Sequence, residues 1–167
     1  MQDRDAAYTL PGGGNPNVWN EETSHSARIT ANPAQNQVGE PVSSRRILVV
    51  EDDPSLANLE AGILVAHGYM VAIARNGEIA IAALQQALPD LVLLDLELSG
   101  AITGWDVLHA LRAYSSTPVL LTSAESAVRK QIRVRGETKT TLDHLPKPYP
   151  MQTLLKRIER MLTIEPS

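Results

Sequence analysis

The sequence predicts an α/β protein in which a five-stranded parallel sheet is doubly wound, with helices on both of its faces. Short apolar runs alternate with segments of helical periodicity from residue 45 onward, which is the pattern of repeated β-α units. The central run, Leu91 to Leu94 between Asp90 and Asp95, is apolar throughout. Such a run is typical of a strand buried on both faces of a parallel sheet.

The strands are predicted from the apolar runs, at residues 46–51, 70–74, a run that ends at residue 95, 118–123 and 142–145. Helices are predicted where apolar residues recur three or four positions apart, at residues 54–67, 78–88, 105–114 and 150–162. In the first helix Asp53 is the expected N-cap and Pro54 lies in the first turn. The apolar face of this helix is expected to hold Leu56, Leu59, Ile63 and Leu64.

The segment 125–140 has the weakest pattern, with little apolar periodicity and several basic residues: Arg129, Lys130, Arg133 and Arg135. It predicts either a short, mobile helix or a surface for an acidic partner, and a solvated face is the commoner explanation of such charges.

Residues 1–44 lack hydrophobic periodicity and are rich in Gly, Pro, Asn, Ser and Thr. Such a segment does not bury enough apolar surface to offset its chain entropy. We therefore predict a disordered N-terminal extension over residues 1–44, followed by one domain over residues 45–167. A tail without a binding role is the favoured interpretation, and a docking peptide anchored by Tyr8 and Trp19 is the alternative.

Composition limits the class of protein. No apolar run approaches the length of a membrane span, and a terminus with Asp3, Arg4 and Asp5 is unlike a secretory signal. The absence of cysteine fits a reducing cytosol, so we expect a cytoplasmic protein without membrane contact. Residues 45–167 hold 13 basic and 14 acidic residues, which gives no electrostatic reason to expect nucleic-acid binding.

Polar residues end four of the predicted strands, and all lie at the same end: Glu51, Asp52 and Asp53, then Asp95, Ser123 and Lys147. Open α/β sheets place their ligand sites at this end of the strands. Clustered carboxylates bind a hard cation such as Mg²⁺, while a hydroxyl and an ammonium suit the oxygens of a phosphoryl group. The arrangement predicts a metal-assisted phosphoryl acceptor.

Four motifs, ILVVEDDP, DLVLLDLEL, PVLLTSA and LPKPY, in this order and spacing, resemble the receiver domain of two-component response regulators. The resemblance covers about residues 45–165. It implies a flavodoxin-like sheet with strand order 2-1-3-4-5.

The resemblance also implies a role for each acid. Asp95 would be the phosphoryl acceptor, and Asp52 and Asp95 would bind Mg²⁺ directly. Glu51 would act through a metal-bound water, and the backbone carbonyl of Glu97 would supply a further oxygen. Asp53 would then cap the first helix. Solvated acids at a strand end are the alternative for the group of three.

By the same resemblance, Ser123 would bind a phosphoryl oxygen and shift inward on phosphorylation, and Lys147 would pair with the aspartyl phosphate. His144 stands where the family usually has a tyrosine or phenylalanine switch. We hypothesise weaker or pH-dependent coupling from Ser123, because histidine titrates near neutral pH; an ordinary exposed histidine is the alternative. Glu97 and Glu125 occupy two positions whose residues, in the family, tune the lifetime of the phosphoryl group.

The favoured function is a stand-alone receiver of the CheY type that is phosphorylated by a sensor histidine kinase. It would signal to a protein target through its helix-4, strand-5, helix-5 face, or pass the group to a histidine phosphotransfer protein. We expect no enzyme activity beyond its own phosphorylation and dephosphorylation. A phosphorylation-independent binding module is the alternative. An aspartate-nucleophile phosphatase is disfavoured, since its acid pair would lie on the first strand.

Overall fold

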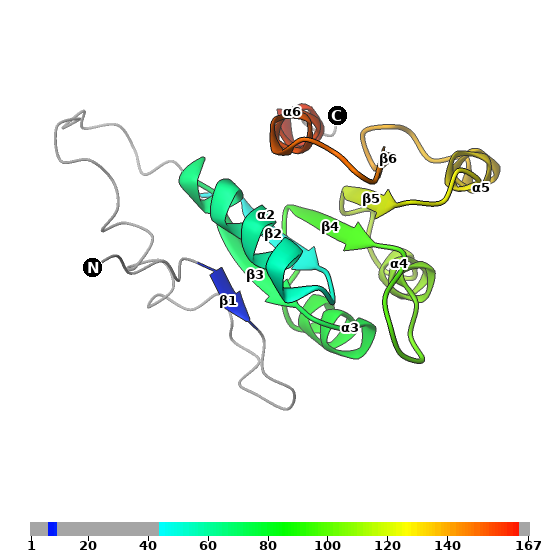
Figure 1. Ribbon diagram of the computed structural model, residues 1–167. Coiled ribbons are helices and arrows are strands. Elements are labelled where there is room, and N and C mark those ends of the chain that lie inside the picture. Colours follow the sequence, from blue (N-terminus) through cyan, green and yellow to red (C-terminus); the bar gives the residue numbers. More distant parts are fainter. Residues whose placement is uncertain (1–6, 10–43, 164–167) are drawn as a thin grey trace, which may run out of the picture.

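The computed structural model describes residues 7–9 and 44–163. Its strands form one parallel sheet: β1 (Ala7–Thr9), β2 (Arg46–Val50), β3 (Met70–Ala74), β4 (Leu91–Asp95), β5 (Val119–Ser123) and β6 (Leu142–Pro146). The strand order is β1-β3-β2-β4-β5-β6 (Figure 1). The five strands predicted from the sequence are β2 to β6, so their predicted order 2-1-3-4-5 is confirmed.

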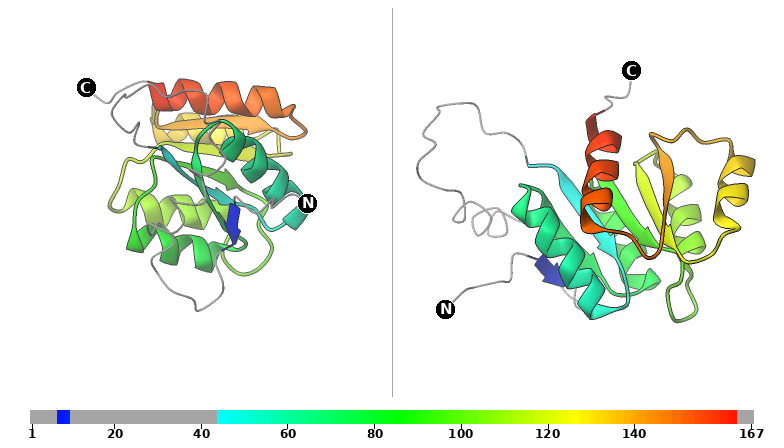
Figure 2. Two further views of the ribbon diagram at one scale, coloured as in Figure 1. Left: turned by 90° about the vertical axis from the view of Figure 1, so that its left-hand side faces the viewer. Right: turned by 45° about the horizontal axis from the view of Figure 1, so that its top comes forward.

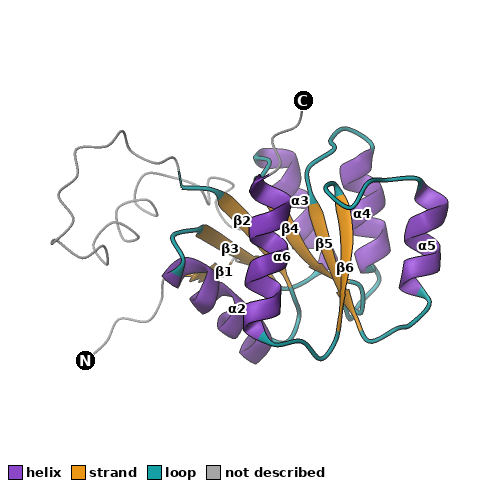
Figure 3. Ribbon diagram, turned by 90° about the horizontal axis from the view of Figure 1, so that it is seen from above, coloured by secondary structure: helices purple, strands orange, loops and turns teal. Residues whose placement is uncertain are grey.

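The helices cover both faces of this sheet: α2 (Pro54–Ala66), α3 (Gly77–Gln86), α4 (Gly104–Arg112), α5 (Val128–Arg135) and α6 (Met151–Thr163). Helices α2 and α6 lie together on one face (Figure 2), where they pack on one set of alternate strand residues. Helices α3 and α4 pack on the other set, and α5 lies beside β6 at the sheet edge (Figure 3). Among the described residues, no helix is long and apolar enough to span a bilayer.

Strand β1 is the main departure from the predicted fold. Ala7–Thr9 pairs in parallel with Val71–Ile73 of β3, although the sequence predicts no strand in residues 1–44. An edge strand leaves backbone N–H and C=O groups unpaired, and a short segment of almost any composition can satisfy them. The rest of the predicted disordered extension, including Trp19, lies outside the described residues.

Helix α2 begins as predicted, because the Asp53 carboxylate accepts hydrogen bonds from the backbone N–H groups of Ser55 and Leu56 at 2.9 and 3.4 Å. Its buried face matches the predicted one at Leu64 but not at Leu59. Leu59 is 55% exposed, and the buried residues are Ala57, Glu60, Ala61 and Leu64. The face is therefore centred on small residues, which let the helix approach the sheet closely.

The start of α4 is pressed against the end of β4. A Cβ atom added to Gly104 would lie 2.3 Å from the backbone oxygen of Asp95, so only glycine fits this contact. Thr103 and Asp106 form a capping box at the same place, which fixes where the helix begins. The loop after Asp95 is thereby anchored at both ends.

Helix α5, in the segment with the weakest sequence pattern, is short. Val128 is its one buried residue, and no side chain caps its N-terminus at Ala127. Gly136 ends it in the left-handed conformation with φ of 70°, which glycine adopts without a steric penalty. Few apolar contacts hold this helix against the domain.

Candidate functional site

Three carboxylates meet where β2 and β4 end. Glu51, Asp52 and Asp95 each offer an oxygen atom, and these atoms lie within 4.8 Å of one another. Glu51 and Asp95 are each only 3% exposed, although buried carboxylates are costly without partners. An oxygen-only set of this spacing suits a hard divalent cation, so the residues present fit the Mg²⁺ expected from the sequence.

Backbone N–H groups hold each of these carboxylates in place. Asp53 donates to Oε1 of Glu51 at 3.2 Å, and Glu97 donates to Oδ1 of Asp95 at 2.9 Å. The Asp52 carboxylate accepts from the N–H of Ser99 at 3.0 Å. Because backbone donors move little, the three carboxylates are positioned before any cation binds.

Lys147 supplies the positive charge of the cluster. Its Nζ atom lies 3.1 Å from Oδ2 of Asp95 and 3.4 Å from Oε2 of Glu51. The peptide bond between Lys147 and Pro148 is cis, as is usual for the family that the sequence resembles. Burial alone would lower the pKa of Lys147, but the charges of Asp95 and Glu51 outweigh it and raise the pKa.

One ammonium does not balance three carboxylates in this space. Burial, followed by the charge of Asp95, raises the pKa of Glu51 from its usual 4.5 to about 8, against the opposing effect of Lys147. Hydrogen bonds from Ser99 lower the pKa of Asp52 in spite of partial burial. The buried end of the cluster therefore disfavours the ionised form of Glu51, and a divalent cation bound there would stabilise that form.

Ser123 lies at the end of β5, beside the cluster. Its hydroxyl donates to Oε1 of Glu97 at 3.1 Å, and the N–H of Ala124 donates to the same oxygen at 2.9 Å. The hydroxyl oxygen also accepts from the N–H of Glu125 at 2.9 Å. The Glu97 carboxylate thus faces Ser123 and is not one of the three clustered carboxylates. The ligand expected from Glu97 is its backbone carbonyl, which remains a prediction.

His144 is buried in β6, only 5% exposed, so the alternative of an ordinary exposed histidine is wrong. Neither ring nitrogen has a hydrogen-bond partner among the described residues. Burial lowers the pKa of His144, and the charge of Arg129 lowers it further. The ring is therefore neutral at neutral pH. Its role as a switch stays a prediction.

The sheet brings together the residues that the sequence singles out. Glu51, Asp52, Asp95 and Lys147 form one cluster, and Ser123 and Glu97 adjoin it. A buried pair was missed: the Tyr149 hydroxyl donates to the carboxylate of Glu60, which is 1% exposed. Glu60 shares a helical stripe with Ala57, Ala61 and Leu64, and this periodicity is the signal that could have identified it.

Comparison with known proteins agrees with this geometry. The sequence profile described as response regulator receiver domain matches residues 47–159. The DNA-binding response regulator MtrA of Mycolicibacterium smegmatis is 37% identical over 118 residues, which cover 71% of this chain and 50% of MtrA. The probable transcriptional regulatory protein TcrX of Mycobacterium tuberculosis is 37% identical over 125 residues, covering 74% and 51%. The chain therefore spans about half the length of these curated relatives.

Solved structures give the same fold. The receiver domain of NtrX from Brucella abortus has a TM-score of 0.62 and 29% identity, covering 71% of this chain and 99% of that domain. The receiver domain of the sensor histidine kinase PA1611 from Pseudomonas aeruginosa has a TM-score of 0.62 at 22% identity, covering 73% and 100%. That structure holds a magnesium ion in its active-site cleft.

Proposed function

Because this chain belongs to the family of response regulator receiver domains, we propose that Asp95 accepts a phosphoryl group from a phosphohistidine in a Mg²⁺-dependent reaction. The observation that carries the proposal is the contact of 3.1 Å between Lys147 and Asp95 within the three-carboxylate cluster. A lone buried acid would lack both the counter-charge and the metal ligands that this reaction needs.

In the transfer, a carboxylate oxygen of Asp95 forms a bond to phosphorus while the bond from phosphorus to the donor nitrogen breaks. The nitrogen keeps the electron pair of that bond. A bound Mg²⁺ would offset negative charge on the phosphoryl oxygens, held by Asp52 and Asp95 directly, by Glu51 through a water and by the carbonyl of Glu97.

The chain's own residues place the acceptor and receive the transferred group. The N–H of Glu97 orients Asp95, and the ammonium of Lys147 offsets charge on the acceptor and then on the phosphoryl oxygens. The hydroxyl of Ser123 donates to one of those oxygens once Glu97 has released it. Phosphoryl transfer depends mainly on such positioning and charge, so no general acid or base is required.

The donor would be a sensor histidine kinase or a histidine phosphotransfer protein, as receiver domains use. The signal would leave through protein contacts on the face of α5, β6 and α6, which is the helix-4, strand-5, helix-5 face of the family. We propose no activity on other substrates, a cytoplasmic location and no nucleic-acid contact by residues 45–167. The relatives MtrA and TcrX are regulators of transcription, but their similarity covers only about half of each protein.

Incubation with acetyl phosphate, followed by intact-protein mass spectrometry, tests the proposal. We expect one added phosphoryl group in the presence of Mg²⁺, and none without it or in Asp95→Asn. Asp53→Asn is a matched control, because asparagine also caps helices well and Asp53 is outside the carboxylate cluster. An unmodified wild type that also fails to bind Mg²⁺ would instead favour the phosphorylation-independent binding module.

A further inference from the structure

A basic groove lies between α5, β6 and α6, away from the carboxylate cluster. It encloses about 340 Å³. Three exposed cations, Arg129, Arg133 and Lys139, contribute to its lining, together with the apolar side chains of Ile132 and Leu142. We use the name basic groove for the surface that these five residues define.

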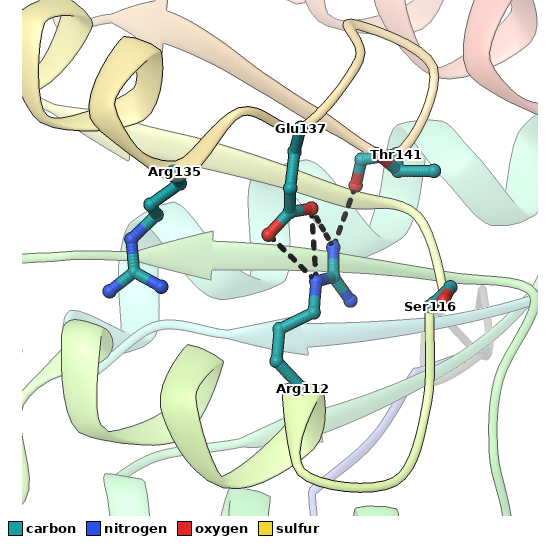
Figure 4. A pocket seen from close by; sticks show the side chains of 5 residues that line it. All are labelled: Arg112, Ser116, Arg135, Glu137 and Thr141. Carbon is teal, nitrogen blue, oxygen red and sulfur yellow. Dashed lines mark hydrogen bonds and ion pairs between the residues drawn. The ribbon is translucent and has the colours of Figure 1, made fainter.

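The acids that also line the groove are already neutralised. Arg112 binds both carboxylate oxygens of Glu137 through Nε at 3.0 Å, and one of them through a second nitrogen at 2.8 Å (Figure 4). Asp143 pairs with Arg157 at 2.9 Å and also with Arg160. These carboxylates therefore have little capacity left to offset the charge of the three exposed cations.

The three cations have no ion-pair partner among residues 7–9 and 44–163. All three are exposed, so each charge stays hydrated and the lack of an ion-pair partner costs the unliganded domain little free energy. Gathered around one concave surface, they raise the local concentration of negatively charged groups. The groove is thus charged in a way that favours an anionic occupant.

His144 also lines the groove. Its ring is buried, and both ring nitrogens lack hydrogen-bond partners in the described part of the chain. A buried polar group without a partner costs free energy. Both nitrogens are shielded from solvent, so an occupant would recover part of that cost only if the ring turned toward the groove.

The chemistry of the lining favours an acidic polypeptide. A second copy of this chain in a symmetric dimer would place the groove against itself, cation against cation. Nucleic acid needs a basic surface that follows a backbone of phosphates, whereas this groove is compact and includes Ile132 and Leu142. A short peptide with carboxylates and one apolar side chain matches both parts of the lining.

We propose that the basic groove binds an acidic peptide segment of a partner protein. Carboxylates of the segment would contact Arg129, Arg133 and Lys139, and an apolar side chain would pack on Ile132 and Leu142. The inference rests on the proposed signalling through this face and specifies the chemistry of the partner. It does not require that Asp95 be phosphorylated for binding to be detected.

Fluorescence anisotropy with a labelled dodecapeptide of glutamate and leucine tests this proposal, beside the same peptide with glutamine in place of glutamate. We expect saturable binding of the acidic peptide alone, weakened by added salt. Arg133→Glu should weaken it by about tenfold or more, since a reversed charge replaces an attraction with a repulsion. Lys130→Glu is the matched control: it makes the same charge change on α5, outside the groove, and should change the affinity by less than about twofold.

The proposal would be overturned by equal binding of both peptides, by equal effects of Arg133→Glu and Lys130→Glu, or by tighter binding of duplex DNA than of the acidic peptide at the same salt. A dimer in sedimentation that does not bind the peptide and that Arg133→Glu dissociates would show that a second copy occupies the groove instead. Circular dichroism checks that each variant is folded.

The same titration with Asp95→Asn separates this inference from the proposed phosphorylation. One result is that peptide binding persists in Asp95→Asn while acetyl phosphate fails to modify the wild type. That result would support the groove proposal and contradict the proposed phosphorylation. Phosphorylation without peptide binding would remove the groove proposal alone.

Discussion

The hydroxyl of Ser123 donates a hydrogen bond to the carboxylate of Glu97 over 3.1 Å. The N–H of Ala124 donates to the same oxygen at 2.9 Å. A phosphoryl group on Asp95 would need the Ser123 hydroxyl as a donor, so the Glu97 carboxylate occupies a donor that the proposed reaction uses. It also places a negative charge beside the incoming phosphoryl group.

Replacing Glu97 should therefore speed phosphorylation by acetyl phosphate. Glu97→Ala frees Ser123 and Ala124 and keeps the backbone carbonyl that is expected to bind Mg²⁺. Since Glu97 is exposed, we expect a gain of about 1 kcal/mol, or about fivefold in rate. Quench-flow or timed mass spectrometry measures the rate.

Two further variants separate the effect of the negative charge of Glu97 from the effect of its hydrogen bond with Ser123. Glu97→Gln keeps an acceptor for Ser123 but removes the charge, so it should fall between wild type and Glu97→Ala. Glu125→Ala removes an acid next to Ser123 whose backbone N–H, and not its carboxylate, is bonded to the hydroxyl. A rate in Glu125→Ala that matches Glu97→Ala would show that general charge, and not the occupied donor, sets the rate.

Lys147→Met should have opposite effects on phosphorylation and on metal binding. The ammonium lies 3.1 Å from Asp95 and 3.4 Å from Glu51, so its removal leaves more negative charge for Mg²⁺ to bind. We expect tighter Mg²⁺ binding by calorimetry, but phosphorylation slower by about tenfold or more because the transferred group loses its counter-charge. Lys156→Met, an exposed lysine on α6, should leave both unchanged. Weaker Mg²⁺ binding in Lys147→Met would contradict the electrostatic explanation.

The fold and the membership of the carboxylate cluster were predictable from the sequence because both depend on local patterns. Apolar runs such as Leu91 to Leu94 predict buried strands, and parallel strands bring the residues at their carboxyl ends to one edge. Glu51, Asp52, Asp95 and Lys147 meet there for this reason. The cap at Asp53 follows from the neighbouring helix start alone.

The features that sequence reasoning missed depend on contacts between distant segments. Strand β1 pairs through backbone groups, which leave little trace in the side-chain pattern. The position of the Glu97 carboxylate is set by donors 26 and 27 residues away. Leu59 was assigned to the buried face of α2, whereas Glu60 is buried because Tyr149, 89 residues away, satisfies its carboxylate.

Gly104→Ala should destabilise the domain, because the added Cβ would lie 2.3 Å from the Asp95 oxygen and 2.6 Å from Cα of Leu96. Neither backbone atom can move freely, so we expect a loss of about 2 kcal/mol in the free energy of unfolding. Gly62→Ala in α2 is the matched control, with no atom within 4 Å of its added Cβ. It should stabilise by up to about 1 kcal/mol through helix propensity. Urea unfolding of both variants measures the difference. A change in the free energy of unfolding that has the same sign in both variants would contradict the predicted contact.

The buried pair of Glu60 and Tyr149 predicts a particular dependence of stability on pH. Burial raises the pKa of Glu60 from its usual 4.5 to about 7, and the hydrogen bond from Tyr149 acts in the opposite direction. The folded state therefore holds a proton on Glu60 at pH values where the unfolded state has lost it. Burial also raises the pKa of Tyr149, so the phenol remains a donor throughout this range.

Glu60→Gln should remove this pH dependence, because glutamine is neutral at every pH. Between about pH 4.5 and pH 7, the unfolded wild type binds fewer protons than the folded one, so its free energy of unfolding falls relative to Glu60→Gln as the pH rises. The relative loss is at most about 3 kcal/mol, and it levels off above the folded pKa. Urea unfolding at several pH values across this range measures the difference between the two proteins. Tyr149→Phe removes the hydrogen bond that lowers the pKa of Glu60 and should extend the decline to higher pH. A difference between wild type and Glu60→Gln that does not change with pH would show that Glu60 is ionised in the folded domain.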